Sequence, residues 1–226
     1  MIDAPLQTDA KPATVLIVDG QPAVREGLAN RISHLSDLQV CGEAGDVESA
    51  LAIVSHTIPD LAIVDIDLKG GSGIELIKLL KDANPALYVL VWSMHADTIY
   101  AERALRAGAE GYINKDQATD HVIRAIRHIL GGRIYLNELL ADQLLRRSLG
   151  RIGEIQSSTP IVCLSHRELE TYRLIGEGLS TREVAHRMIT HVRTVETYLA
   201  RIKKKFHFEN RQQLVHAAVQ WTLENR

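Results

Sequence analysis

The chain has 226 residues, of which 46% are hydrophobic and 24% are charged, as is ordinary for a soluble globular protein. This length allows two domains of modest size, each able to bury a core. No apolar run approaches the roughly 18 residues of a membrane-spanning helix, and residues 1–12 lack the apolar segment of a signal peptide. The two cysteines are far apart without metal-binding spacing, so we expect both to be reduced and the protein to be cytoplasmic.

Charge is distributed unevenly along the chain. Residues 1–136 hold 12 Lys and Arg against 18 Asp and Glu, a net charge of −6. Residues 161–226 hold 11 against 7, a net charge of +4, and the residues between are neutral overall. An acidic first part and a basic last part suggest a module that handles a metal ion or phosphate, joined to one that binds nucleic acid.

Strands and helices are predicted to alternate in the first part of the chain. Short runs rich in Val, Ile and Leu are typical of buried parallel strands. They lie at residues 15–18, 38–44, 61–65, 87–93 and 111–114. Helices are predicted at residues 22–35, from the Asp46 cap to residue 56, from a glycine-rich loop at 70–73 to before Pro85, and at 97–107 and 119–130. Five strand–helix units predict a doubly wound parallel sheet.

Four polar residues, Asp19, Asp65, Ser93 and Lys115, directly follow the apolar runs at 15–18, 61–64, 87–92 and 111–114. In an open α/β sheet the chemistry lies just beyond the carboxyl ends of the strands, so we expect these side chains to converge. Two carboxylates, a hydroxyl and an ammonium form a set that handles phosphoryl groups. Such a set needs a nucleophilic Asp, a metal-binding acid, a hydroxyl that senses the phosphoryl group and a Lys that pairs with it.

The last part of the chain has no strand signal. Capping boxes at Ser165 with Glu168 and at Ser180 with Glu183 open two short helices, and further helices are predicted over about 192–206 and 211–224. Four short helices with a tight turn before a basic helix describe a helix-turn-helix unit. We therefore predict a disordered tail at residues 1–13, an α/β domain at 14–131, a linker at 132–161 with a helix at 137–149 and a flexible joint at 150–160, and a helix-turn-helix domain at 162–226.

These motifs resemble the NarL/FixJ family of response regulators, in which a receiver domain precedes a LuxR-type helix-turn-helix domain. The receiver motifs are Val18-Asp19, Asp65 with Gly70 and Gly73, Ser93-Met94, Gly108-Ala109, Gly111-Tyr112 and Lys115-Asp116. The second set is Leu164-Ser165, Arg167-Glu168, Gly178-Leu-Ser180, Glu183-Val-Ala185 and Thr194-Val195. The resemblance implies a flavodoxin-like receiver, a four-helix DNA-binding domain and a transcription regulator that is not an enzyme. It further implies a homodimer that acts on double-stranded DNA.

The resemblance also implies roles for the residues at the sheet edge. Asp65 would accept a phosphoryl group from a sensor histidine kinase or a small phosphodonor. Lys115 would pair with a phosphoryl oxygen, Ser93 would donate a hydrogen bond to the group, and Tyr112 is at the family's aromatic switch position. Mg²⁺ is the implied cofactor. It prefers oxygen ligands, and the candidate acids are Asp19, Asp65 and Asp67.

One departure from the family puts the metal in question. Gly20 stands where a second metal-binding acid belongs and supplies no side-chain oxygen, although Asp67 returns one negative charge and Lys69 adds a cation. We expect Mg²⁺ binding to be weak or absent and phosphorylation of Asp65 to be impaired. A degenerate receiver that regulates without phosphorylation, or a protein-interaction module, stays open. A remote alternative, suggested by Asp65-Ile-Asp67, is an Asp-x-Asp phosphatase.

The helix over residues 192–206 is the predicted recognition helix. We expect base contacts from Glu196, Thr197 and Arg201, and phosphate contacts from Arg193, Thr194 and Lys204. The predicted core residues are Val184, Ala185, Met188, Val195, Leu199 and Ile202. His191 stands at the helix N-cap, where the family often has Ser, and the weaker cap costs about 1 kcal/mol. On the last helix, Val215 and Trp221 either form a dimer surface or pack internally.

Overall fold

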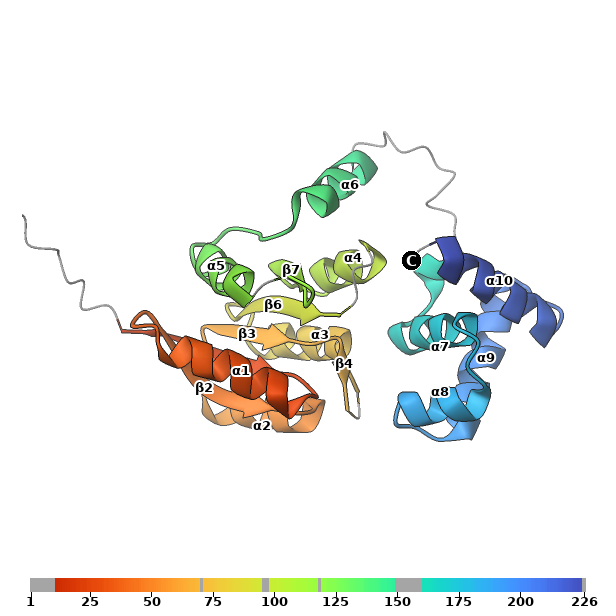
Figure 1. The fold of residues 1–226 in the computed structure, drawn as a ribbon, viewed down its shortest axis with the longest axis horizontal. Coiled ribbons are helices and arrows are strands. Elements are labelled where there is room, and N and C mark those ends of the chain that lie inside the picture. The colour runs from red at the N-terminus through yellow and green to blue at the C-terminus, as the bar shows by residue number, and fades with distance from the viewer. Residues whose placement is uncertain (1–10, 70, 95–97, 118, 149–159, 225–226) are drawn as a thin grey trace, which may run out of the picture.

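The computed structural model describes residues 11–69, 71–94, 98–117, 119–148 and 160–224. An α/β domain comes first and an all-helical domain follows it (Figure 1). Within these ranges, no helix combines the length and the apolar character that crossing a bilayer demands.

Five parallel strands form the central sheet, in the order β2-β1-β3-β6-β7. Their bounds are β1 (Ala13–Val18), β2 (Leu38–Ala44), β3 (Leu61–Val64), β6 (Tyr88–Ser93) and β7 (Gly111–Asn114). This order is that of a doubly wound, flavodoxin-like sheet, so the predicted fold class is confirmed. Ala13 already belongs to β1, whereas the predicted tail included it. Residues 1–10 of that tail lie outside the described residues.

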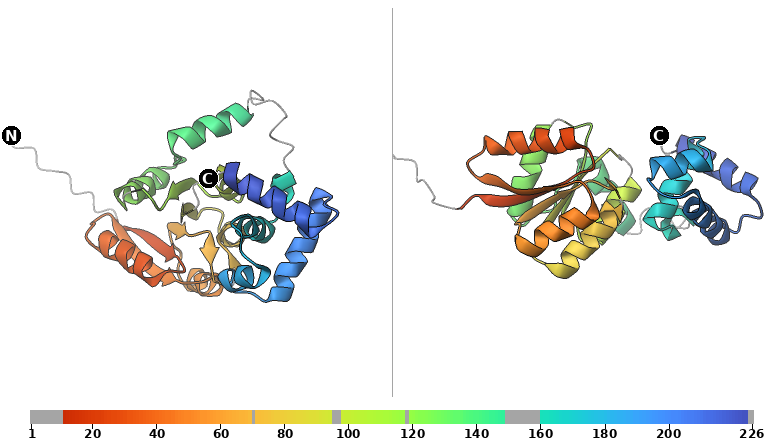
Figure 2. Two further views of the ribbon diagram at one scale, coloured as in Figure 1. Left: turned by 45° about the vertical axis from the view of Figure 1, so that its right-hand side comes forward. Right: turned by 90° about the horizontal axis from the view of Figure 1, so that it is seen from below.

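Helices cover both faces of the sheet (Figure 2). On one face lie α1 (Pro22–Ser33) and α5 (Thr119–Leu130); on the other lie α2 (Val47–His56), α3 (Gly73–Ala83) and α4 (Thr98–Arg106). Local sequence explains where some of them begin. Pro22 occupies the first turn of α1, and the Asp46 carboxylate caps α2 by accepting from the Ser49 N–H at 2.8 Å. Because the helices cover the two faces, the candidate functional residues lie at the carboxyl ends of the strands.

The glycine-rich segment after β3 is not a plain loop, and this part of the prediction was wrong. It forms an antiparallel hairpin of β4 (Asp67–Leu68) and β5 (Gly71–Ser72). Gly73, at the start of α3, is required by a close backbone approach. A Cβ atom there would lie 2.0 Å from the backbone oxygen of Asp65, closer than any side chain allows. The hairpin and α3 are therefore held tightly against the end of β3.

The second domain consists of α7 (His166–Gly176), α8 (Thr181–Arg187), α9 (Val192–Phe206) and α10 (Arg211–Glu224), preceded by α6 (Glu138–Ser148) and a 3-10 turn, η1 (Pro160–Cys163). Most of the predicted joint at 150–160 lies outside the described residues. Both predicted capping boxes are formed. All six predicted core residues, Val184, Ala185, Met188, Val195, Leu199 and Ile202, are buried.

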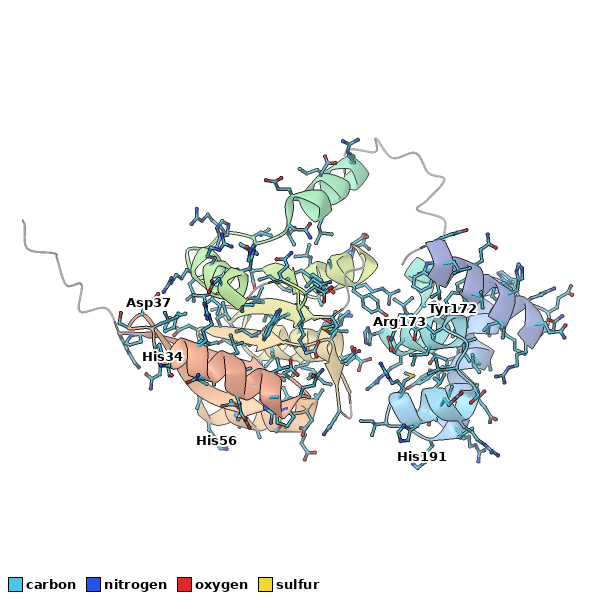
Figure 3. The ribbon with its side chains drawn as sticks, in the orientation of Figure 1. His34, Asp37, His56, Tyr172, Arg173 and His191 are labelled. Atoms are coloured by element: carbon cyan, nitrogen blue, oxygen red, sulfur yellow. The ribbon has the colours of Figure 1, made fainter. Side chains whose placement is uncertain are left out.

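An aromatic cluster binds α10 to the rest of the helical domain. The Tyr172 ring on α7, labelled in Figure 3, lies 5.9 Å from the Trp221 ring and 5.3 Å from the Phe206 ring. Burial raises the pKa of Tyr172 to about 12. Trp221 and Val215 are partly buried against this core. Trp221 thus contacts the core and stays partly exposed, so both interpretations of this residue stay open.

Candidate functional site

Three side chains predicted to converge meet at the carboxyl edge of the sheet. Asp19 follows β1, Asp65 follows β3 and Lys115 follows β7, and both carboxylates are buried. The Lys115 ammonium lies 2.6 Å from Asp19 Oδ2 and 2.7 Å from Asp65 Oδ2. A single cation thus bridges two acids in a site with little access to water.

The remaining oxygens of the two acids have different surroundings. Asp19 Oδ1 accepts a hydrogen bond from the Gln21 N–H at 2.8 Å, and the Asp19 carbonyl accepts one from Arg25 Nη1 at 2.7 Å. Asp65 Oδ1 is buried and has no hydrogen-bond partner in the described part of the chain. Asp65 Oδ1 is therefore the oxygen of the acid pair that no described donor engages. Arg25 is not predicted from the sequence, although it lies one turn into the helix that follows Asp19.

Burial and charge compete at this pocket. Burial raises the pKa of Asp65; Lys115 lowers it, and the neighbouring acids Asp19 and Asp67 raise it, with a net upward direction. Burial works to lower the pKa of Lys115, but the Asp65 and Asp19 carboxylates outweigh it, so the pKa of Lys115 is raised. Lys115 therefore stays charged and holds the two acids together.

Ser93 and Tyr112 lie on the two last strands of the sheet, β6 and β7. Ser93 is fully buried at the end of β6, and its carbonyl accepts from the Lys115 N–H at 2.8 Å. The preceding Trp92 ring lies 5.8 Å from the Lys115 ammonium, a cation–π distance. Tyr112 is buried on β7 in the core shared with α3 and α4. This hydrogen bond would therefore transmit a movement of Ser93 to the backbone of Lys115.

The predicted metal-binding acids are not grouped. The described residues hold no cluster of three or more His, Cys, Asp or Glu side chains that could bind a metal ion. Within β4, Leu68 is buried and Asp67 is exposed, while Lys115 bonds to both Asp19 and Asp65. A Cβ atom at Gly20 would lie 3.4 Å from the backbone oxygen of Asp67, so a carbonyl borders the place of the missing acid. The trio of Asp19, Asp65 and Asp67 as side-chain ligands therefore stays a prediction, and the exposed Asp67 is the member that departs most from the buried acid pair.

The two domains are in contact, and Tyr100 lies at the centre of this contact. Its hydroxyl donates to Glu170 Oε2 of α7 at 3.2 Å, and its ring packs edge-on against His166 at 5.7 Å. Glu170 also accepts from Arg173, which is labelled with Tyr172 in Figure 3. Burial, followed by the charge of Glu170, raises the pKa of Tyr100 well above its usual range. Tyr100 therefore remains a neutral hydrogen-bond donor.

Two arginines extend this interdomain contact. Arg103 of α4 donates to the Ile161 carbonyl at 2.8 Å, and Arg167 of α7 donates to the Gly71 carbonyl in the hairpin that follows Asp65. The segments after Asp65 and after Ser93 thus both touch the helical domain. Sequence patterns do not predict this contact, although a lone aromatic residue at Tyr100 in a polar helix is a weak signal of one.

The predicted recognition helix presents a polar face to solvent. Among the predicted contact residues, Thr194 is partly exposed and the other five are exposed. A shallow groove of about 720 Å³ runs along this face. Its lining residues are His191, Arg193, Thr194, Thr197, Tyr198 and Arg201. Glu196 and Lys204 are exposed on the same helix, outside the groove lining.

The N-cap of α9, His191, and the helix residue Lys205 have local roles in the helical domain. His191 caps α9 without a side-chain hydrogen bond, and it lies at the end of the domain where α8 is drawn in Figure 3. Lys205 bonds to the Cys163 carbonyl at 2.8 Å and to the Glu168 carboxylate. Lys205 therefore tethers α9 to η1 and α7. Tyr198, in the groove lining, is not among the predicted contact residues.

A buried acid pair with its lysine on a doubly wound sheet, followed by a helix-turn-helix with an exposed polar helix, defines a two-domain response regulator. The family model for the response regulator receiver domain matches residues 15–127, and that for bacterial regulatory proteins of the luxR family matches residues 162–218. The chain belongs to the NarL/FixJ family of DNA-binding transcriptional response regulators, as its motifs predict.

Known proteins resemble the chain over nearly its whole length. It is 35% identical to the transcriptional activator protein ExaE of Pseudomonas putida over 207 residues, covering 91% of this chain and 95% of that protein. It is 33% identical to the transcriptional activator DevR/DosR of Mycobacterium tuberculosis, covering 88% and 90%. The fold resembles RcsB of Salmonella typhimurium with a TM-score of 0.64 at 23% identity, covering 93% and 98%.

Proposed function

We propose that Asp65 is the phosphoacceptor of this regulator and that it works with weakened dependence on Mg²⁺. The observation that carries the proposal is Asp65 Oδ1, a buried carboxylate oxygen without a hydrogen-bond partner among the described residues, beside the Lys115 ammonium. Oδ1 attacks phosphorus while the bond from phosphorus to the donor's leaving oxygen breaks, and the leaving group departs with that electron pair. Lys115 then pairs with an oxygen of the bound phosphoryl group, and the Ser93 hydroxyl donates to another.

The weak metal dependence follows from the donor set. Gly20 offers no side-chain oxygen, Asp67 is exposed, and Lys115 bonds to the two acids that remain. These residues do not supply the ring of oxygens that Mg²⁺ prefers, so no step above passes through the metal. The positive charge in the pocket comes from Lys115, with Arg25 at its edge.

A Mg²⁺ titration tests this point, with Trp92 fluorescence as the signal because its ring lies 5.8 Å from the Lys115 ammonium. A Trp221→Phe background leaves Trp92 as the sole tryptophan. The Gly20→Asp variant has room for its Cβ atom and restores a direct ligand. Loss of outer-shell partners costs about 10–100-fold in metal affinity, so restoring a direct ligand should tighten Mg²⁺ binding by about tenfold or more. Equal affinity of the two proteins would contradict the role given to Gly20.

We further propose that the protein binds duplex DNA as a homodimer in the cytoplasm, with a sensor histidine kinase as phosphodonor. Base contacts come from Glu196, Thr197 and Arg201, and phosphate contacts come from Arg193, Thr194 and Lys204. The exposure of this set on α9, opposite the buried stripe of the same helix, supports these roles. Both full-length relatives named above are transcriptional activators, which agrees with this proposal.

Salt dependence tests the phosphate contacts. In wild type, the affinity for a short mixed-sequence duplex should fall steeply with salt, with a slope of about −0.9 per phosphate contact. Lys204→Gln should make that slope shallower by about one contact in each protomer. Lys78→Gln, an exposed lysine on α3, is the matched control and should leave the slope unchanged. Equal slopes for the two variants would show that Lys204 makes no phosphate contact.

A second candidate function is a degenerate receiver that regulates without phosphorylation. The observation in its favour is that the Lys115 ammonium pairs with both acids of the pocket. In this alternative the pocket is a structural ion cluster, and the contact of Tyr100 with Glu170 is set by another signal. The Asp-x-Asp phosphatase alternative has less support, because the motif follows the third strand of a receiver domain, whereas such phosphatases usually carry it after their first strand.

A further inference from the structure

Ile189, in the turn between α8 and α9, has an unfavourable backbone conformation. Its φ angle is +50°, in the left-handed region that β-branched residues rarely adopt. The turn closes α8 through the N–H of Ile189 bonding to the His186 carbonyl at 3.2 Å and the N–H of Thr190 bonding to the Ala185 carbonyl at 2.9 Å. Glycine is the usual residue at such a helix end. The backbone therefore gives no reason for an isoleucine here.

Packing gives no reason either. The Ile189 side chain is 63% exposed, in contrast to the preceding Met188, which is buried. A strained backbone and an exposed apolar side chain thus occur together at one residue. Strain of this kind persists where function requires it, so the combination points to a contact made outside the chain.

The position of Ile189 indicates what that contact is. The residue lies two positions before His191, the N-cap of α9 and part of the lining of the exposed groove. Val192, the first residue of α9, is also apolar and 38% exposed. In a helix-turn-helix the N-terminal end of the recognition helix faces base edges in the major groove. The apolar feature presented there is the C5-methyl group of thymine.

We propose that Ile189 is a specificity-determining residue that packs against the C5-methyl group of a thymine at the edge of the DNA site, with Val192 extending the apolar surface. This inference rests on the proposed DNA interface of α9 and adds a sequence preference to it. Ile189 stands in the turn before the recognition helix, outside the set of six predicted contact residues.

Selection from a pool of random-sequence duplexes by the full chain gives the first test. Wild type and Ile58→Ala, a control at an exposed isoleucine of the receiver, should enrich a thymine at one defined position. Ile189→Ala and Ile189→Gly should lose that preference and keep the others. If both variants still select the thymine, or if wild type selects none, the proposal is wrong. Wild type that retains no duplex at low salt would refute the DNA interface itself, and the inference with it.

Deoxyuridine gives the second test, because it differs from thymidine only by the missing methyl group. Replacing the selected thymine by deoxyuridine should weaken wild-type binding by about fivefold, and should leave the affinities of both Ile189 variants unchanged. Equal losses in wild type and variants would overturn the proposal. Ile189→Gly should also raise the unfolding temperature of the helical domain by several degrees, followed by Trp221 fluorescence in a Trp92→Phe background. A lower unfolding temperature would assign Ile189 a structural role instead.

Discussion

Replacing Lys115 by Met should destabilise the receiver far more than the loss of a surface charge. The Lys115, Asp19 and Asp65 side chains are only 5%, 3% and 6% exposed, so solvent does little to screen the acids that the substitution leaves behind. Removing one partner of a buried ion pair costs about 3–5 kcal/mol of unfolding free energy. Methionine has a similar length to the lysine stem, so most of this loss is electrostatic and little comes from a cavity.

The same substitution should change how stability depends on pH. In wild type the pKa of Lys115 is raised above 10.5, so its contribution is fully present below that pH and is lost as the pH rises through the raised value. In Lys115→Met, Asp65 loses the cation that lowers its pKa, so that pKa rises further above its ordinary value. A carboxyl group with a raised pKa favours the folded state once it is protonated. The variant should therefore regain stability as the pH falls from neutral into the acid range.

Urea unfolding of the full chain at neutral and mildly acidic pH measures both effects, with Trp92 as the reporter in a Trp221→Phe background. The matched control is Arg127→Gln, which breaks the pair of Arg127 with Asp37, two side chains that are each 48% exposed. An exposed pair of this kind contributes about 0–1 kcal/mol. If Lys115→Met loses no more stability than the control, or if acid does not restore it, the electrostatic account of the pocket is wrong.

Three further changes have defined outcomes. His191→Ser should add a side-chain cap to α9 and stabilise the helical domain by about 1 kcal/mol in thermal unfolding; no gain would mean that His191 already caps the helix. Gly73→Ala should destabilise the receiver by about 3 kcal/mol or more, because its Cβ atom meets the Asp65 carbonyl; unchanged stability would contradict that geometry. Tyr100→Phe should loosen the interdomain contact by about 1 kcal/mol and increase the radius of gyration in small-angle scattering, whereas an unchanged radius would show that the Glu170 hydrogen bond contributes little.

Local signals in the sequence predict most of the fold. The bounds of β2, β7, α5, α9 and α10 agree with the predicted segments, and α2 begins after its Asp46 cap as predicted. Each of these elements has an apolar periodicity or a capping residue of its own, so its bounds can be predicted from neighbouring residues alone. The β4–β5 hairpin is not predicted, because strands of two residues have no period and the surrounding glycines also suit a loop.

The site is predictable in part for the same reason. Asp19, Asp65 and Lys115 converge because each follows a strand, and the parallel sheet brings strand ends together. The direction of Asp67 depends on the hairpin, and the contact of Tyr100 with Glu170 joins residues 70 positions apart. Tertiary packing decides such features, and no pattern along the chain specifies them.

The most direct test of the central proposal is the intact mass of the protein during incubation with acetyl phosphate at increasing Mg²⁺ concentrations. Wild type should gain the mass of one phosphoryl group, Asp65→Asn should gain none, and the gain in wild type should depend less on the Mg²⁺ concentration than the gain in Gly20→Asp. The absence of any adduct on wild type at every Mg²⁺ concentration would contradict the proposal. It would make the receiver a fixed scaffold whose acid pocket serves only its structure.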